Sequence, residues 1–211
     1  MIIPEDVTSI GEGAFSGCYS LSNIIISASV TSIGQHAFNS CYSISSITIP
    51  KGVTSIDQYT FHSCSSLNNV IIPKSVISIG NKAFQSCSSL NSIIIPIGVT
   101  NIGDNVFSFC SSLSSVIIPE GITNISDKVF YNCTSLSSII IPSSVTNIND
   151  TFEDCESMAE YHFKSTTPPT INSNAFRDIP SDCIIYIPRG SLAAYQSAQY
   201  WSTYASQMVE E

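Results

Sequence analysis

The sequence contains few charged residues. Asp, Glu, Lys and Arg make up 11% of its 211 residues, whereas about 25% is usual in soluble proteins. Basic residues are the scarcer kind, because 7 Lys and Arg stand against 16 Asp and Glu, which gives a net charge of −9. Such a charge repels nucleic-acid phosphates and anionic lipid headgroups. We therefore expect no nucleic-acid partner.

Long apolar segments are missing as well. No run approaches the roughly 20 apolar residues that a membrane helix needs, and the chain shows no secretory signal. We expect no membrane insertion. The absence of a signal does not point to the cytoplasm, because Ile3 and Pro4 occupy the last positions of an incomplete repeat unit. We interpret the chain as a fragment whose earlier units, and any signal sequence, lie upstream.

Motifs of catalysis and cofactor binding are also lacking. The sequence has no G-x-S-x-G nucleophile motif, no Gly-rich phosphate loop and no C-x-x-C pair for zinc. None of the three histidines, His36, His62 and His162, shares a repeat position with an acid and a nucleophile. Catalysis needs convergent residues of different types. We therefore expect that the chain is not an enzyme and binds no cofactor and no metal.

What the sequence does contain is an internal repeat of 23 residues. Its unit reads P-x-x-V-T-x-I-x-x-x-A-F-x-x-C-x-S-L-x-x-I-x-I. Phe marks six copies of this length, at Phe15, Phe38, Phe61, Phe84, Phe107 and Phe130, and Cys follows each Phe by three. Two further copies, centred on Phe152 and Phe176, differ in length by one residue. Eight copies in register predict a solenoid, because a unit this short cannot bury its apolar side alone.

Each unit has residues for three sides of a coil. The L-x-x-I-x-I segment predicts the main strand, with Leu21, Ile24 and Ile26 pointing inward in the first copy. The V-T-x-I segment predicts a second, short strand, and the A-F-x-x-C segment predicts a helical turn. Parallel strands of successive coils would form one sheet along the molecule. The fold class is therefore an α/β-type solenoid of about eight repeats over residues 1–188, which we expect to be a right-handed superhelix.

Residues 189–211 depart from the repeat and are interpreted as a cap. Ser191 is a suitable helix N-cap, and an apolar stripe follows it at Leu192, Tyr195, Trp201 and Tyr204. This stripe predicts a helix that covers the last coil, because a bare terminal coil would expose core and unpaired strand edge.

Cysteines and acids form two further candidate clusters. Seven of the eight Cys residues occupy one repeat column, where we expect buried thiols; occasional disulfides or redox chemistry are the alternatives. The acids Asp150, Glu153, Asp154, Glu156 and Glu160 lie within eleven residues. They favour a solvated acidic face, with a cation site as the alternative.

The outward positions of the main strand are the candidate binding site. One outward column reads Ile25, Thr48, Ile71, Ile94, Ile117 and Ile140, and ends at His162. A polar column runs beside it, with Asn23, Ser46, Asn69, Ser92, Ser115 and Ser138, and ends at Glu160. Exposed contiguous apolar residues usually mark an interaction site. The alternative is that β-branched residues stack here only as favourable cross-strand pairs.

The repeat resembles the BspA-type leucine-rich-repeat family, on strings such as VTSIGQHAFNSCYSISSITIP. The segment from TTPPTI to the final residues resembles the terminal part of bacterial members. The resemblance implies a secreted or cell-surface protein of host-associated microbes that acts in adhesion or protein binding. The expected partner is a protein, such as a host extracellular or surface protein, or a second copy that binds through the Ile column or the N-terminal edge. The alternative function is a structural spacer with no specific ligand.

Overall fold

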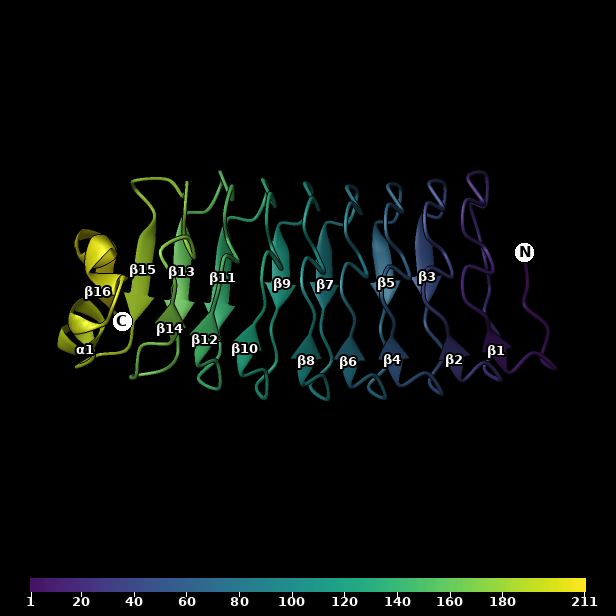
Figure 1. Ribbon diagram of the computed structural model, residues 1–211, viewed down its shortest axis with the longest axis horizontal. Coiled ribbons are helices and arrows are strands. Elements are labelled where there is room, and N and C mark those ends of the chain that lie inside the picture. Colours follow the sequence, from purple (N-terminus) through teal and green to yellow (C-terminus); the bar gives the residue numbers. More distant parts are fainter.

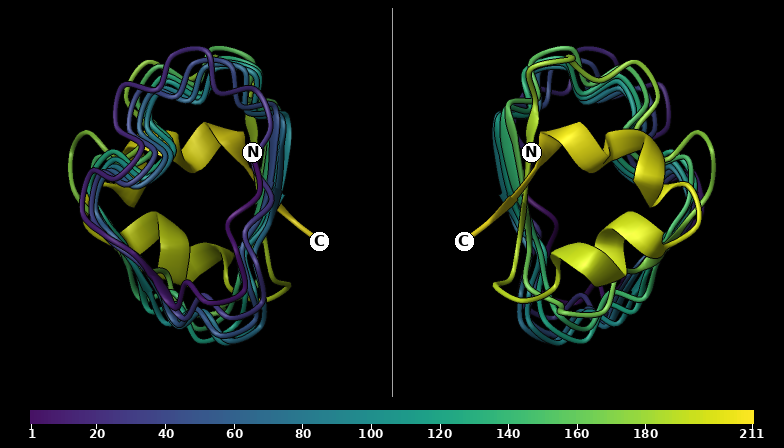
Figure 2. Two further views of the ribbon diagram at one scale, coloured as in Figure 1. Left: turned by 90° about the vertical axis from the view of Figure 1, so that its right-hand side faces the viewer. Right: turned by 90° about the vertical axis from the view of Figure 1, so that its left-hand side faces the viewer.

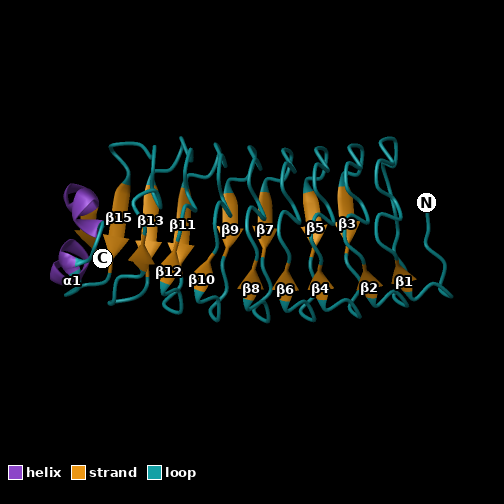
Figure 3. Ribbon diagram, viewed as in Figure 1, coloured by secondary structure: helices purple, strands orange, loops and turns teal.

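The computed structural model describes all residues, 1–211, and forms a parallel β-solenoid of about nine turns with a repeat of about 23 residues. Figure 1 shows the coils side by side along one axis, with strands in two rows. The predicted solenoid and its repeat length are confirmed. Turns and loops make up most of each coil, as Figure 3 shows, and the helices lie at the C-terminal end.

The main sheet contains the strands predicted from the L-x-x-I-x-I segments. They are β3 (Ser46–Thr48), β5 (Asn69–Ile71), β7 (Ser92–Ile94), β9 (Ser115–Ile117), β11 (Ser138–Ile141), β13 (Glu160–Phe163) and β15 (Ile184–Ile187). The first coil contributes only an isolated bridge between Ile2 and Ile25. The alternation is as predicted, because the middle residue of most of these strands is buried while its neighbours are exposed.

A second sheet forms from the V-T-x-I segments, with strands of two residues each. They are β1 (Ser9–Ile10), β2 (Ser32–Ile33), β4 (Ser55–Ile56), β6 (Ser78–Ile79), β8 (Asn101–Ile102), β10 (Asn124–Ile125), β12 (Asn147–Ile148) and β14 (Thr170–Ile171). Each pair is parallel and aligns equivalent repeat positions, such as Ile79 with Ile102. The strands are this short because the preceding Val is also inward, which breaks the alternation of period two.

The third side of each coil differs from the expected helical turn. Residues around each Phe form consecutive turns. In the six full-length repeats the positions two before and two after the Phe have positive φ, as in His36 (56°) and Ser40 (58°) around Phe38. Left-handed residues at both positions interrupt any helical run. The backbone instead bonds to the next coil, since the amide of Phe38 donates to Thr60 O at 2.9 Å.

The core is a column of rings and thiols. Successive Phe rings stack with centroids 5.3–5.8 Å apart from Phe15 to Phe176. Six of the thiols, from Cys41 to Cys155, donate to the Phe carbonyl one coil earlier, as Cys87 Sγ does to Phe61 O at 3.2 Å. All eight cysteines are free thiols, and seven are buried; Cys18 is exposed. Burial raises the pKa of Cys110 to about 12.

The C-terminal segment contains two short helices and a strand. Helix α1 spans Leu192–Ser197, a 3-10 helix η1 spans Trp201–Gln207, and β16 spans Met208–Glu210. Figure 2 shows the helices lying across the end of the solenoid. Tyr195 and Trp201 are buried there, and Leu192 and Tyr204 pack partly against the core. No helix has the length and apolarity that crossing a membrane requires.

The tail strand and the helix cap are two features that the sequence analysis missed. Strand β16 extends the main sheet by pairing in parallel with β15, Ile185 opposite Met208. Ser191 stands at the N-cap position of α1, but its hydroxyl donates to Pro188 O and not to the helix. The carboxylate of Glu210 takes its place and accepts from the amides of Gly190 and Leu192, at 3.0 and 2.9 Å.

Candidate binding surface

The predicted outward columns lie on one exposed face of the main sheet. We call the first column the Ile stripe; its members are Ile25, Thr48, Ile71, Ile94, Ile117 and Ile140. We call the second the polar column; its members are Asn23, Ser46, Asn69, Ser92, Ser115 and Ser138. All twelve residues are exposed, and the Ile side chains of the stripe are 54–68% exposed. Their orientation follows from the alternation of a strand whose other face is buried; their role in binding stays a prediction.

Strand register aligns these residues into straight rows. Ser46 pairs with Asn69 and Thr48 with Ile71 in the β3–β5 ladder. Ser92 pairs with Ser115 and Ile94 with Ile117 in the β7–β9 ladder. Parallel strands place equivalent repeat positions about 4.8 Å apart. The face therefore presents one apolar and one polar row along the solenoid.

The ladder of the main sheet is interrupted twice along this face. Hydrogen-bonded strands form separate groups, in the orders β3-β5, β7-β9 and β11-β13-β15-β16. No ladder joins β5 to β7, and none joins β9 to β11. Val70 and Ile72, which point inward from β5 and the residue after it, are therefore only partly buried.

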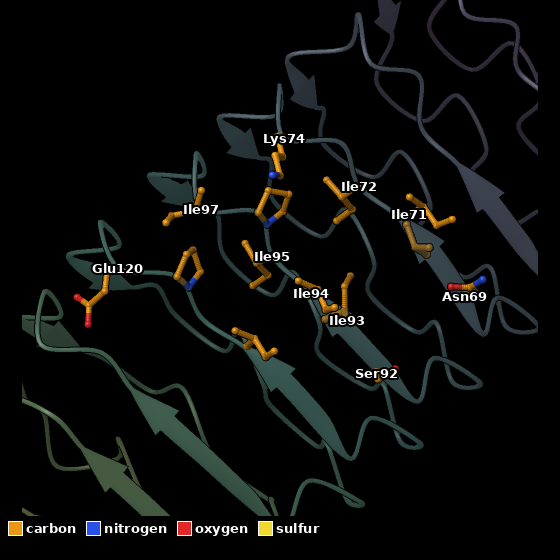
Figure 4. Close-up of a pocket in the computed structure, with 14 residues that line it drawn as sticks. Asn69, Ile71, Ile72, Lys74, Ser92, Ile93, Ile94, Ile95, Ile97 and Glu120 are labelled. Atoms are coloured by element: carbon orange, nitrogen blue, oxygen red, sulfur yellow. The ribbon is translucent and has the colours of Figure 1, made fainter.

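A shallow groove of about 620 Å³ lies over the first interruption, between β5 and β7, and extends to β9. Figure 4 shows Ile71 and Ile94 on the strands, and Lys74, Ile97 and Glu120 on the turns that follow them. Ile97 has the most exposed large apolar side chain of the chain, at 76%. Ile97 was not predicted from the sequence as a binding residue. Its position in the repeat would have revealed it, because the other coils carry charged or small residues there, such as Lys74, Glu120 and Ser143.

The rim of the groove carries a positive charge at one end and a negative charge at the other. Lys74 and Glu120 line it at opposite ends, with Ile97 between them. Lys51 lies beside Lys74 in the preceding coil, and both border a second, smaller hollow. The carboxylate of Glu120 accepts from the amide and hydroxyl of Ser143, each at 3.3 Å. This carboxylate is thereby oriented while remaining exposed.

The C-terminal end of the face is different in chemistry. His162 follows the Ile stripe and stacks on Tyr186 with centroids 4.7 Å apart. Its two ring nitrogens lie 3.2 Å from Glu160 and 3.1 Å from Glu211. Hydrogen bonds from Lys164 and His162 lower the pKa of the Glu211 carboxyl. These contacts also hold the chain end, next to β16, against β13.

The acidic cluster around residues 150–160 does not form one solvated face. Glu153 is buried and pairs with Arg177, and Glu160 lies on the main sheet beside His162. A buried carboxylate needs such a partner, because desolvation otherwise disfavours its charge. No group of three or more His, Cys, Asp or Glu side chains is arranged to hold a metal ion.

The comparisons with known proteins agree with the architecture. The family model described as BspA type leucine rich repeat region matches residues 1–110 and 77–200 in six copies. No curated protein matches the sequence.

Three bacterial leucine-rich-repeat structures are similar to this chain. One from Bacteroides ovatus has a TM-score of 0.72 and 29% identity over 90% of this chain and 58% of its own. One from T. pallidum has a TM-score of 0.71 and 32% identity, over 75% of this chain and 77% of its own. A leucine-rich cell surface protein from Faecalibacterium prausnitzii has a TM-score of 0.58 and 31% identity, over 77% of this chain and 59% of its own. The chain therefore spans little more than half the length of the Bacteroides protein.

Proposed function

Because this chain belongs to the BspA-type leucine-rich-repeat family, we propose that it is the protein-binding module of a secreted or cell-surface protein. The chain is similar to a Faecalibacterium protein described as a leucine-rich cell surface protein, and this similarity supports the location. The proposed partner is another protein, and host extracellular or surface proteins are the class to test first. Neither nucleic acid nor membrane insertion is part of the proposal.

The exposure of the Ile stripe is the observation that carries the proposal. Ile71, Ile94 and Ile117 are 54%, 68% and 56% exposed in three successive coils. Exposed contiguous apolar patches beyond a few hundred Å² usually mark an interaction site. The polar column borders this apolar row, which resembles the core and rim of a protein interface.

The interruption between β5 and β7 supports the same location. A partly opened ladder leaves a groove in which side chains of a partner fit between those of the strands, whereas a continuous ladder presents a flatter surface. Lys74 and Glu120 add opposite charges at the two ends of this groove. Such charges mainly set orientation and association rate, while the apolar centre supplies affinity.

Replacing Ile71, Ile94 and Ile117 with Thr tests the proposal. Thr suits strands, and these side chains point away from the core, so the melting temperature should change little. Binding to a panel of purified extracellular matrix and plasma proteins is measured by biolayer interferometry. For any protein that the wild type binds saturably, we expect the triple variant to lose at least tenfold in affinity, about 1.4 kcal/mol.

Ile77→Thr is the matched control. Ile77 is 57% exposed, but it precedes β6 on the second sheet, where most coils carry Thr. The same chemical change there should leave binding unaltered. Full affinity in the folded triple variant would contradict the location of the site. Absence of saturable binding by the folded wild type would favour a structural spacer.

A further inference from the structure

The turn after each main strand carries a distinctive row of side chains, which we call the rim row. From the third coil onward it reads Lys51, Lys74, Ile97, Glu120 and Ser143. The salt bridges of the chain use His162, Lys164 and Arg177 as their cations. Lys51 and Lys74 therefore have no anionic partner within one copy, although the chain as a whole carries a net charge of −9.

Lys74 and Glu120 do not pair with each other inside one molecule. They lie two coils apart, which is roughly 10 Å at a spacing of about 4.8 Å per coil. A salt bridge needs a separation of about 4 Å. The two charges are instead placed symmetrically about Ile97, and Ile94 of the Ile stripe belongs to the same coil as Ile97.

This order of side chains is self-complementary under one particular rotation. Consider a two-fold axis that runs parallel to β7 and passes over Ile94. It reverses the order of the coils and keeps each position along the strand. Lys74 of each copy then faces Glu120 of the other copy, which gives two equivalent pairs. Lys51 faces Ser143 in the same way. Within the Ile stripe, Ile94 faces itself and Ile71 faces Ile117.

The polar column obeys the same relation. Ser92 faces its own counterpart, Asn69 faces Ser115, and Ser46 faces Ser138. No two like charges of the rim row or of the polar column meet. A two-fold axis along the solenoid would instead place Lys74 across from the polar column and leave it without an anion. Isologous contacts require this kind of self-matching, with residue i on j and j on i.

We propose that the Ile stripe binds a second copy of this chain, face to face and with the two solenoids antiparallel. The inference rests on the proposed function, because it names the protein that the same face binds. The proposed dimer is isologous. The rim row supplies two Lys74–Glu120 salt bridges, and the Ile stripe supplies the apolar centre.

The size of the face suits such a dimer. Seven coils at about 4.8 Å span roughly 34 Å, and a strand with its turn spans about 20 Å. The product, about 680 Å² per copy, approaches the roughly 800 Å² that each partner contributes to a stable interface. Two sheets packed in this way lie about 10 Å apart, which allows their side chains to interdigitate.

Reversal of the two charges tests the arrangement. Sedimentation velocity over a concentration series gives the dimer dissociation constant of the wild type. Lys74→Glu and Glu120→Lys should each raise that constant at least tenfold, because each places like charges together at two symmetric sites. The double variant should restore it to within about threefold. Lys128→Glu makes the same charge change beside Tyr131, away from the face, and should have no effect.

A cross-link locates the axis independently. In a Cys18→Ser background, which removes the exposed thiol, Ser92→Cys places a thiol next to its own counterpart on the axis. A short bis-maleimide should then join the two thiols into a covalent dimer, because facing sheets lie about 10 Å apart, which is too far for a disulfide. Ser138→Cys, in the same column but two coils away, faces Ser46 of the other copy and should not cross-link.

The outcomes separate this inference from the proposed function. A wild type that stays monomeric at several hundred micromolar, while the triple Ile variant loses affinity for an extracellular protein, overturns the dimer and leaves the proposed function standing. A dimer indifferent to both single charge reversals, or one that cross-links through Ser138→Cys, overturns the antiparallel arrangement. Dimerisation that follows the charge-reversal pattern supports the inference even when no extracellular protein binds.

Discussion

At the scale of single residues, the repeated Phe and Cys positions act together across coils. Phe61 supplies a ring that stacks on Phe84 and a carbonyl that accepts from the thiol of Cys87. The same residue therefore contacts the following coil through both side chain and backbone. The sequence revealed that these positions are inward, because they recur in register with the strands. The hydrogen bond from a thiol to the previous coil could not be predicted, because it depends on the direction in which the turns point the Phe carbonyl.

Phe84→Ala tests this column. Phe84 is fully buried between Phe61 and Phe107, with ring centroids 5.3 and 5.7 Å away. Removing a buried Phe leaves a cavity and lowers the free energy of unfolding by about 3–5 kcal/mol. Phe109→Ala is the control, because its ring is 43% exposed and should cost less than about 1 kcal/mol. Equal losses in urea denaturation of the two variants would show that this column is not the core.

Thiol reactivity tests the burial of the Cys column. Cys18 is exposed, whereas Cys64, Cys87 and the others are buried. Burial raises the pKa of Cys64 and Cys87 and so disfavours the thiolate, which is the reactive form. Titration with Ellman's reagent at pH 8 should find about one thiol in the native protein and eight after denaturation. Cys18→Ser should remove the native reaction; several fast thiols in that variant would contradict the burial.

At the scale of elements, the strand faces were predictable and their spacing was not. The alternation around Ile93 and Ile94 determines which side chain is exposed, because the strand has only two faces. The gap between β5 and β7 depends on the distance between coils, which no repeat position encodes. The turns around Phe38 were predicted as helical because their left-handed residues, His36 and Ser40, are not the glycines typical of that conformation.

The glycine that precedes the turns in four coils, at Gly11, Gly34, Gly80 and Gly103, offers an element-level test. A Cβ on Gly80 would lie 2.8 Å from the backbone nitrogen of Gln58, one coil earlier. Gly80→Ala should therefore lower the free energy of unfolding by about 1–3 kcal/mol through overpacking. Gly11 has the same repeat position, but a Cβ there would meet nothing within 4 Å, so Gly11→Ala should be neutral or slightly stabilising. Equal stability of the two variants would show that the coils readily move apart.

The cap illustrates how element-level features escape a sequence pattern. The aromatic stripe predicted that Tyr195 and Trp201 cover the last coil, and both are buried. The strand β16 was missed because Met208–Glu210 is too short to display a clear alternation. Glu210 was missed as a cap because it follows the helix by 13 residues and reaches its first turn only through the pairing of β16 with β15.

At the scale of the whole molecule, the thiol column links stability to pH. Burial raises the pKa of seven thiols above their ordinary value of 9, to about 11 for Cys41 and about 12 for Cys110 and Cys155. A thiol is neutral when protonated and charged when ionised. As the pH rises, the thiols of the unfolded chain therefore ionise at a lower pH than the buried thiols of the folded chain. The stability that these thiols contribute is therefore complete below pH 9 and is lost as the pH rises through 11–12.

The expected result is a steep loss of stability above pH 9. Each thiol that is ionised only in the unfolded chain lowers the free energy of unfolding by about 1.36 kcal/mol per pH unit. Cys64, Cys87 and Cys110 lie in three successive coils of one solenoid, so their contributions to this slope should add. The triple change of these residues to Ala should reduce the slope between pH 10 and 11 by about 4 kcal/mol per unit. Cavities left by Ala alter stability at every pH but not its slope, so urea denaturation across pH 7–11 separates the two effects. An unchanged slope would mean that water reaches the thiols and that the column of coils opens in alkali before the chain unfolds.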